Sequence, residues 1–144
     1  MEYIIRKAWE FDKEFLLELR KVTMTEYLEG MNILLSEQEH MQRVDSFFDD
    51  SYIIEDNSRN KIWLLKYTED VNILELIQLQ ILPEFQNKWI GSKVLDALII
   101  KSQKSAKKCI LKVLKNNPAI TLYQRKGFQV VWEDDIEYHM AGSN

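Results

Sequence analysis

The chain has 144 residues, and 19 Lys and Arg against 23 Asp and Glu leave a formal net charge of −4. This length suits one domain with a single core, and an apolar share of 46% is typical of a globular chain rather than a disordered one. A mildly acidic chain lacks the basic surface of a general nucleic-acid binder. No apolar run approaches the roughly 20 residues of a membrane span. We therefore expect one globular domain, residues 1–144, that binds neither nucleic acid nor a membrane.

The few cysteines and histidines argue against a disulfide and against a metal site. The one cysteine, Cys109, cannot form an internal disulfide, which favours a reducing, cytoplasmic setting. It lies in an apolar stretch with no histidine placed to activate it, so we interpret it as an inert core residue. His40 and His139 lie far apart in the sequence, and no metal is expected.

The first half of the chain predicts a strand, two helices and two further strands. The charges of Arg6 and Lys7 are expected to end the first strand. Asp12 is expected to cap the first helix, and Ser36 with Glu39 forms a capping box for the second. The expected positions are a strand at 3–5, a helix from 13 to about 28, a helix from 37, and strands at 51–55 and 61–68.

The second half predicts a long central strand followed by alternating helices and strands. The longest and most apolar strand is expected at 72–82, in the middle of the sheet. Asn117, Pro118 and Gly127 mark both ends of a short helix. The other expected elements are a helix at 90–104 and strands at 108–114, 128–132 and 136–140. This order predicts a mixed α/β sheet with helices on both faces.

The loop after the central strand is the first candidate binding site. It runs from Gln86 to Ser92 and leads into a helix N-terminus, where unpaired N–H groups and a partial positive charge favour phosphates. Lys88 would add a full charge. Such turns occur in every α/β protein and most of them bind nothing, so this pattern alone leaves both interpretations open.

A second stretch, Asn116–Phe128, resembles a known family. Its Asn-Pro-Ala triplet and its Leu-Tyr and Gly-Phe pairs match the second core motif of the GCN5-related N-acetyltransferase (GNAT) family. The segment Gln86–Gly91 falls where the first motif of that family, Gln/Arg-x-x-Gly-x-Gly/Ala, is expected. The order of elements agrees over essentially the whole chain. The resemblance implies a three-layer α/β/α fold with a mixed, centrally splayed β-sheet.

One residue departs from the family pattern. Trp89 stands where the motif has its first glycine, while Gln86 and Gly91 are retained. A glycine permits positive φ and close approach of the backbone, and tryptophan permits neither cheaply. Three interpretations follow: the loop tolerates the side chain, pyrophosphate binding is weakened, or the ring covers part of the cofactor or of a partner subunit.

The resemblance implies direct transfer of an acetyl group from acetyl-CoA to a primary amine of a small molecule or peptide. By position, the strand backbone would pair with pantetheine, the loop N–H groups would hold the pyrophosphate, and a tyrosine would protonate the departing thiolate. The corresponding residues are Leu79, Gln80 and Ile81; Gln86, Asn87, Lys88, Trp89, Ile90, Gly91 and Ser92; Asn117 or its neighbour Asn116 for the cofactor arm; and Tyr123.

The chemistry requires further groups that no motif fixes. A strand N–H, on Leu79 or Ile81, would stabilise charge on the carbonyl oxygen. An amine with a pKa of ~10.4 is almost fully protonated at pH 7, so a base is needed. Glu75 on the central strand is the first candidate and Glu26 on the first helix the second.

Several of these residues also have a plain structural interpretation. Helix capping alone would account for Asn117, and Tyr123 alone would pass for a core aromatic. Glu75 either ionises at a wet cleft or pairs with a lysine. Gln78 and Gln80 share one face of their strand, which suggests a polar groove there.

The acceptor and the assembly are less constrained. By resemblance, residues 23–32 and 132–139 would line the acceptor pocket, and this composition suits a cationic amine with an apolar portion. The named contributors are Met24, Tyr27, Met31 and Trp132 as an apolar wall, with Glu26 and Glu29 as negative charges. Residues 133–135 are interpreted as a solvated turn, with an acidic lip as the alternative.

Two alternatives to acetyl transfer remain. Trp89 favours a non-catalytic CoA-binding or protein-interaction module that keeps the fold, whereas Tyr123 and the intact second motif oppose it. A longer acyl chain would differ only in pocket volume. A homodimer is expected by resemblance, with the apolar closing strands as its interface.

Overall fold

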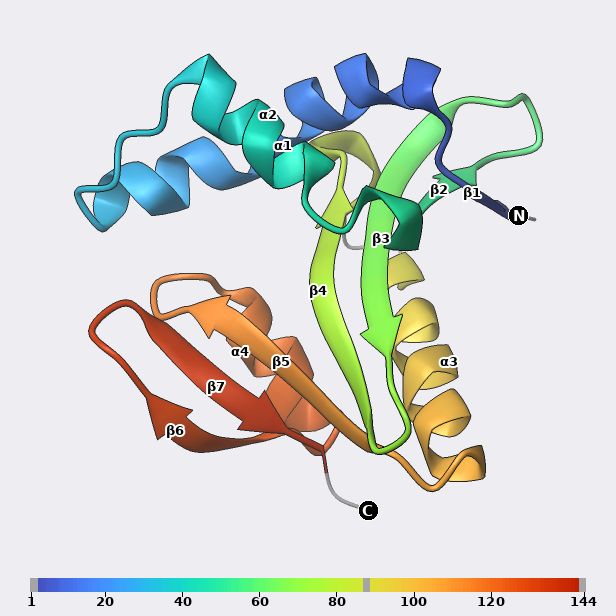
Figure 1. The fold of residues 1–144 in the computed structure, drawn as a ribbon, viewed down its shortest axis with the longest axis vertical. Coiled ribbons are helices and arrows are strands. Elements are labelled where there is room, and N and C mark those ends of the chain that lie inside the picture. Colours follow the sequence, from blue (N-terminus) through green and yellow to red (C-terminus); the bar gives the residue numbers. More distant parts are fainter. Residues whose placement is uncertain (1–2, 87–88, 143–144) are drawn as a thin grey trace. The chain divides into compact units, whose positions relative to one another are not determined.

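The computed structural model describes residues 3–86 and 89–142. Seven strands form one sheet in the order β1-β2-β3-β4-β5-β7-β6 (Figure 1). β4 and β5 are parallel, and the β1–β2, β2–β3, β5–β7 and β6–β7 pairs are antiparallel. The predicted mixed α/β sheet is therefore confirmed.

The contacts of the chain divide it into two compact units. The first unit comprises residues 1–66 and 78–86, and the second comprises residues 67–77 and 87–144. The prediction that residues 1–144 form a single domain stays a prediction.

The first unit carries two helices on one face of its strands. Its elements are β1 (Ile4–Lys7), η1 (Glu10–Asp12), α1 (Lys13–Gly30), α2 (Glu37–Asp45), η2 (Phe48–Asp50), β2 (Ser51–Glu55), most of β3 (Lys61–Glu69), the end of β4 (Ile73–Ile81) and η3 (Pro83–Phe85). Leu16 and Leu19 of α1 and Val44 of α2 form a buried cluster with Ile53 of β2 and Leu64 of β3. Burial of these apolar side chains holds both helices on the strands.

The helix starts in the first unit agree with the sequence, but one capping prediction is wrong. The box at α2 is present: Glu39 N–H donates to Ser36 Oγ at 3.1 Å, and Ser36 N–H donates to Glu39 Oε1 at 3.0 Å. α1 begins right after Asp12, yet the Asp12 side chain makes no capping bond to that helix. It is 0% exposed and is held by charged side chains instead.

Asp12 is the centre of a buried ion-pair cluster. Arg6 donates to both of its carboxylate oxygens, at 2.8 and 2.9 Å, and Lys61 lies 2.7 Å from Oδ1. The N–H of Trp9 donates to Oδ2 at 2.7 Å. Arg6 also pairs with Glu55 at 3.1 Å. β1 includes Arg6 and Lys7, so their charges do not end it as expected; the charge of Arg6 is neutralised on the strand.

The second unit alternates helix and strand. It contains α3 (Ile90–Lys104), β5 (Lys108–Leu114), α4 (Ala119–Arg125), β6 (Gln129–Glu133), β7 (Glu137–Ala141), and the adjoining ends of β3 and β4. The bounds of α3 and β5 are those predicted. Cys109, Leu111 and Val113 of β5 are buried, whereas Lys108 and Lys112 on its other face are exposed. Cys109 is thus confirmed as a buried, free cysteine.

The two ends of α4 follow the predicted signals. Asn117 Oδ1 accepts from the N–H of Ala119 at 2.9 Å, and α4 begins at Ala119, one residue later than the predicted start at Pro118. Gly127 follows the helix with φ of 96°, a conformation that side chains disfavour. The N–H of Phe128 then donates to the carbonyl of Tyr123 at 3.0 Å. These bonds satisfy helix-end groups that would otherwise be unpaired.

Candidate active-site residues

The pairing of β4 with β5 is short. In the second unit it runs from Ile73 opposite Lys108 to Leu76 opposite Leu111. β5 continues to Leu114, where it still pairs with β7, opposite Glu137. The parallel pairing with β4 therefore ends at Leu111, three residues before the end of β5 at Leu114.

The final residues of β4 lie in the first unit and include a buried amide. Gln80 is 5% exposed, and its Oε1 atom has no hydrogen-bond partner among the described residues. Leaving a buried acceptor unpaired costs about 1–3 kcal/mol. Gln86 has a local role, because its Nε2 donates to the carbonyl of Ile81 at 2.9 Å and so ties the following loop to the strand end. Gln80 Oε1 is thus a buried acceptor without a hydrogen-bond donor among the described residues.

The start of α3 shows how the chain accommodates a tryptophan in the glycine position. Trp89 has φ of 64° and ψ of 5°, in the left-handed region, and its side chain is 71% exposed. Its carbonyl accepts from the N–H of Lys93 at 3.0 Å, the first bond of the helix. The loop therefore keeps a glycine-like backbone at this position. Asn87 and Lys88, also predicted to contact the cofactor, lie outside the described residues.

Tyr123 of α4 is a buried aromatic residue whose hydroxyl group is protonated. It is 7% exposed, and its ring meets that of Phe128 edge to face with centroids 6.1 Å apart. Burial raises the pKa of Tyr123 to about 12, so the hydroxyl stays protonated at any physiological pH. Asn117 caps α4 through Oδ1, as its plain interpretation predicts.

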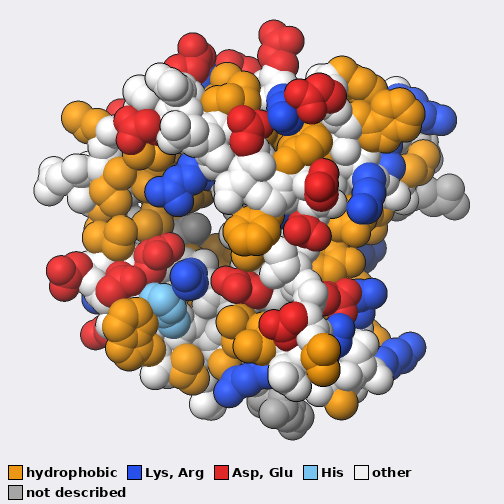
Figure 2. Space-filling view, in the orientation of Figure 1, with side chains coloured by type: hydrophobic (Ala, Val, Ile, Leu, Met, Phe, Trp, Pro, Cys, Tyr) orange, Lys and Arg blue, Asp and Glu red, His pale blue; other side chains and the backbone are white. Residues whose placement is uncertain are grey.

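Glu75 shares one face of the second-unit sheet with several polar and aromatic side chains. It lies opposite Ile110 of β5, and Lys112 of β5 lies opposite His139 of β7. His139 also lies opposite Trp132 of β6. Residues opposite each other point to the same face. We call the set Glu75, Ile110, Lys112, His139 and Trp132 the Glu75 face. Figure 2 shows a histidine at the surface over β6 and β7, among hydrophobic and charged side chains.

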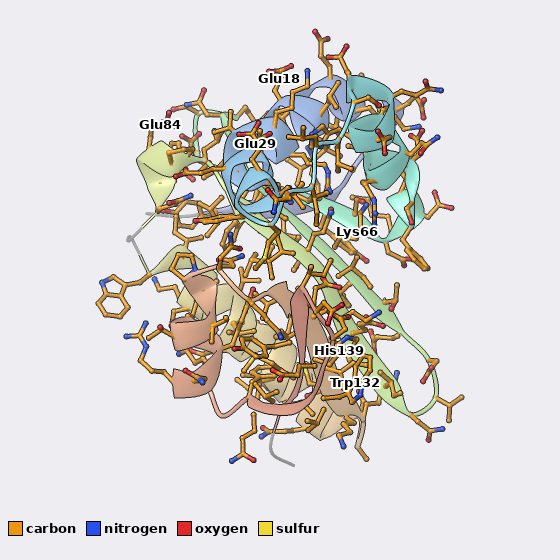
Figure 3. The ribbon with its side chains drawn as sticks, turned by 90° about the vertical axis from the view of Figure 1, so that its left-hand side faces the viewer. Glu18, Glu29, Lys66, Glu84, Trp132 and His139 are labelled. Atoms are coloured by element: carbon orange, nitrogen blue, oxygen red, sulfur yellow. The ribbon has the colours of Figure 1, made fainter. Side chains whose placement is uncertain are left out.

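A bond between His139 and Asp134 was not expected from the sequence. His139 Nε2 lies 3.2 Å from Asp134 Oδ2, while Asp134 Oδ1 accepts from the N–H groups of Ile136 at 2.9 Å and Glu137 at 2.6 Å. These bonds, the one from Glu137 foremost, lower the pKa of Asp134 to about 2. The rings of Trp132 and His139 are 4.5 Å apart, edge to face (Figure 3). The turn lies at 134–136, because Glu133, predicted to belong to it, is the last residue of β6 and pairs with Tyr138; the carboxylate of Asp134 in this turn also binds His139.

The other predicted acceptor residues lie on α1 or, for Met31, directly after it, in the first unit. Glu26 and Glu29 are exposed, and Met24, Tyr27 and Met31 are half-buried. Trp132, predicted to join them, belongs to the second unit and is 60% exposed. Within residues 3–86 and 89–142 there is no group of three or more His, Cys, Asp or Glu that could hold a metal. No helix in those ranges is long and apolar enough to cross a membrane.

Residues 49–130 match the sequence model of the acetyltransferase (GNAT) domain. No curated protein sequence matches the chain. Among solved structures, the PaiA N-acetyltransferase of Thermoplasma acidophilum in complex with coenzyme A is similar over 100% of both chains, with a TM-score of 0.75 and 22% identity. Naa50 of Arabidopsis thaliana, in complex with a bisubstrate analogue of CoA and a peptide, is similar over 100% of both chains, with a TM-score of 0.73 and 15% identity. An acetyltransferase of Thermus thermophilus gives a TM-score of 0.76 and 13% identity over 98% of this chain and 96% of that one.

Proposed function

The chain belongs to the GNAT family of acetyl-CoA-dependent acetyltransferases, and we propose that it moves an acetyl group from acetyl-CoA directly to a primary amine of a small molecule or peptide. The unpaired, buried Oε1 of Gln80 on β4 carries the proposal. Pantetheine contains amide N–H groups, and one of them would satisfy this acceptor.

The cofactor arm is assigned to the end of β4. The backbone of Leu79, Gln80 and Ile81 would pair with the pantetheine amides as a neighbouring strand would. Asn117 would contact the arm through its Nδ2 group, because its Oδ1 is already used to cap α4.

The pyrophosphate is assigned to the loop after β4 and the first turn of α3. The first N–H groups of a helix have no acceptor within it, and those of Ile90, Gly91 and Ser92 are at this position. The left-handed backbone of Trp89 supports the assignment, since the loop retains the conformation that the motif glycine permits. Gln86, Asn87 and Lys88 complete the proposed loop.

The remaining residues handle protons and charge. Acetyl-CoA supplies the acetyl group as a thioester. A backbone N–H of Leu79 or Ile81 would stabilise the charge that develops on the carbonyl oxygen. Tyr123, protonated and buried, would give a proton to the departing sulfur. Glu75 is the first candidate to receive the proton of the acceptor ammonium, and Glu26 the second.

A cationic amine with an apolar portion is the proposed acceptor, on the composition of the named α1 residues and Trp132. The chain would act in the cytoplasm, consistent with its free, buried Cys109. We also propose a homodimer through β6, the edge strand, where Val130 and Val131 are both exposed. Sedimentation equilibrium of native protein and of the Val131→Lys variant tests this, because a charge in the interface should give a monomer.

Calorimetric titration with acetyl-CoA is the decisive experiment, with native protein and Trp89→Gly in parallel. Micromolar binding by native protein, followed by release of free CoA in a screen of primary amines, is the expected result. The second candidate, a non-catalytic module, is favoured by the strained Trp89. It predicts either no binding until Trp89→Gly restores it, or binding without turnover of any amine.

A further inference from the structure

His139 is bound in a way that fixes which of its nitrogens is basic. Asp134 is a carboxylate at working pH, because its pKa is lowered to about 2, and a carboxylate only accepts hydrogen bonds. Its contact with His139 at 3.2 Å therefore requires a proton on Nε2. In the neutral ring the lone pair then belongs to Nδ1.

The Asp134 carboxylate is itself held in place. Two backbone N–H groups, of Ile136 and Glu137, bind its other oxygen at 2.9 and 2.6 Å. A carboxylate fixed by the backbone that orients an imidazole is the arrangement that prepares histidine to act as a base. The β6–β7 turn does not need the bond to His139, because Asp134 Oδ1 already accepts from the two backbone N–H groups of that turn.

The surroundings of His139 combine an aromatic wall with charges of both signs. Trp132 packs against the ring at 4.5 Å and remains 60% exposed. Lys112 lies directly opposite on β5, and Glu137 lies two residues away on the same strand face. β7 is two strands from β4 in the sheet, so Glu75 is on the order of 10 Å away across β5.

We propose that His139, oriented by Asp134, takes the proton from the acceptor ammonium at Nδ1, while the acceptor packs its apolar portion on Trp132. This inference rests on the proposed function and moves the role of base from Glu75 to His139. A base is most effective when its pKa lies near the working pH, and an imidazole meets this condition better than a carboxylate does. Glu75 then attracts the cationic acceptor.

These residues account for both protons that the acceptor ammonium loses in the reaction. The ammonium gives one proton to Nδ1 of His139, which leaves a neutral amine with a lone pair. That lone pair forms the new C–N bond to the acetyl carbon, while the C–S bond breaks and its electron pair leaves with the sulfur. A second proton passes from the amine nitrogen to the sulfur through Tyr123, and His139 returns its proton to water.

Nitrogen-15 NMR of the imidazole rings tests the geometry without any turnover. The chain has two histidines, so the His139→Gln spectrum assigns the His139 signals by their loss. We expect the Nε2–H form in native protein and the Nδ1–H form in Asp134→Asn, because an amide that keeps its oxygen on the backbone N–H groups presents a donor to Nε2. An Nδ1–H form in native protein, or the same tautomer in both proteins, overturns the proposal.

Steady-state kinetics tests the role, with phenethylamine as the probe acceptor. His139→Gln should lower kcat about 100-fold with an unchanged KM for acetyl-CoA, and Asp134→Asn should lower kcat by a smaller factor, also with an unchanged KM, because the imidazole remains but loses the carboxylate that fixes its tautomer. Glu133→Gln is the matched control, because it removes an exposed charge from the end of β6, next to Asp134, and should change neither quantity.

The kinetic outcomes separate this inference from the function it rests on. If His139→Gln has the kcat and the circular dichroism spectrum of native protein, the role of His139 is overturned, but the proposed function is not. Native protein that binds acetyl-CoA but acetylates neither phenethylamine nor any other primary amine overturns both.

Discussion

The ammonium group of Lys66 lies 2.6 Å from the backbone carbonyl oxygen of Ser46, just past the end of α2. It also donates to the carbonyls of Arg43 at 3.1 Å and Val44 at 3.3 Å, and its side chain is 1% exposed (Figure 3). A cation here satisfies carbonyls that the helix leaves free and meets the negative end of its dipole. Burial and the nearby charge of Arg20 nevertheless lower the pKa of Lys66 to about 8.

Lys66 should make the protein more stable at alkaline pH. Between about pH 8 and the ordinary lysine pKa of 10.5, the unfolded chain holds a proton on Lys66 that the folded chain has lost. The free energy of unfolding therefore rises with pH across this window, by up to about 3 kcal/mol. Urea unfolding of native protein and Lys66→Met measures it: the difference between the two should grow from pH 8 to 10.5. An equally steep dependence in Lys66→Met would contradict the assignment, and Lys104→Met, at an exposed position, is the control.

Asp12→Asn should be strongly destabilising. Burial opposes ionisation of Asp12, but the bonds from Arg6 and Lys61 outweigh it and hold its pKa well below the ordinary value. The stabilisation is therefore complete above about pH 4 and is lost as the pH falls further. Removing the charge leaves two cations facing each other and should lower the free energy of unfolding by about 3 kcal/mol at pH 7.

Chemical denaturation of Asp12→Asn at pH 7 and pH 3 checks this value. The difference in free energy of unfolding between Asp12→Asn and native protein should be smaller at pH 3 than at pH 7. Glu10→Gln, in the same turn but at an exposed position, should stay within about 0.5 kcal/mol of native protein. If Asp12→Asn lowers the free energy of unfolding by no more than Glu10→Gln does, the ion-pair cluster contributes little to stability.

Trp89→Gly should stabilise the fold. A left-handed conformation costs a residue with a side chain about 1–2 kcal/mol, which glycine avoids, and little burial is lost because the ring is 71% exposed. We expect a gain of about 1 kcal/mol in thermal or urea unfolding. Trp89→Ala separates backbone from ring: it keeps the Cβ and should match native protein. Equal stability of all three proteins would mean that the left-handed backbone carries no cost.

Tyr123→Phe should slow catalysis without unfolding the protein. The ring packs on Phe128 in either case, so the fold and acetyl-CoA affinity are retained. Loss of the proton donor should lower kcat about 100-fold. Because the pKa of Tyr123 is raised to about 12, native kcat should show no loss from its ionisation below pH 10. Full kcat in Tyr123→Phe would return Tyr123 to a purely structural role.

The sequence predicted the elements whose signals are local. The capping box of α2, the ends of α4 and the bounds of α3 and β5 depend on residues a few positions apart, and all were right. Asp12 was misassigned because Lys61 reaches it from β3, a contact that helix-capping rules do not include. The bond between His139 and Asp134 was missed because it depends on how two strands are registered across a turn. The sequence shows that Trp89 departs from the family motif, but the left-handed backbone at this position is a property of the folded loop that the residue type does not predict.

The ion-pair cluster around Asp12 also predicts how this part of the chain changes during evolution. One carboxylate serves Arg6, Lys61 and a backbone N–H, so the loss of the carboxylate leaves Lys61 without its partner in the cluster and leaves Arg6 with Glu55 alone. A substitution at one of these positions alone is therefore expected to lower stability. Joint replacement of all three residues by apolar residues of similar volume need not lower it. In sequences that descend from the same ancestor, positions 6, 12 and 61 are expected to covary, and a homologue without the aspartate should lack the two cations as well.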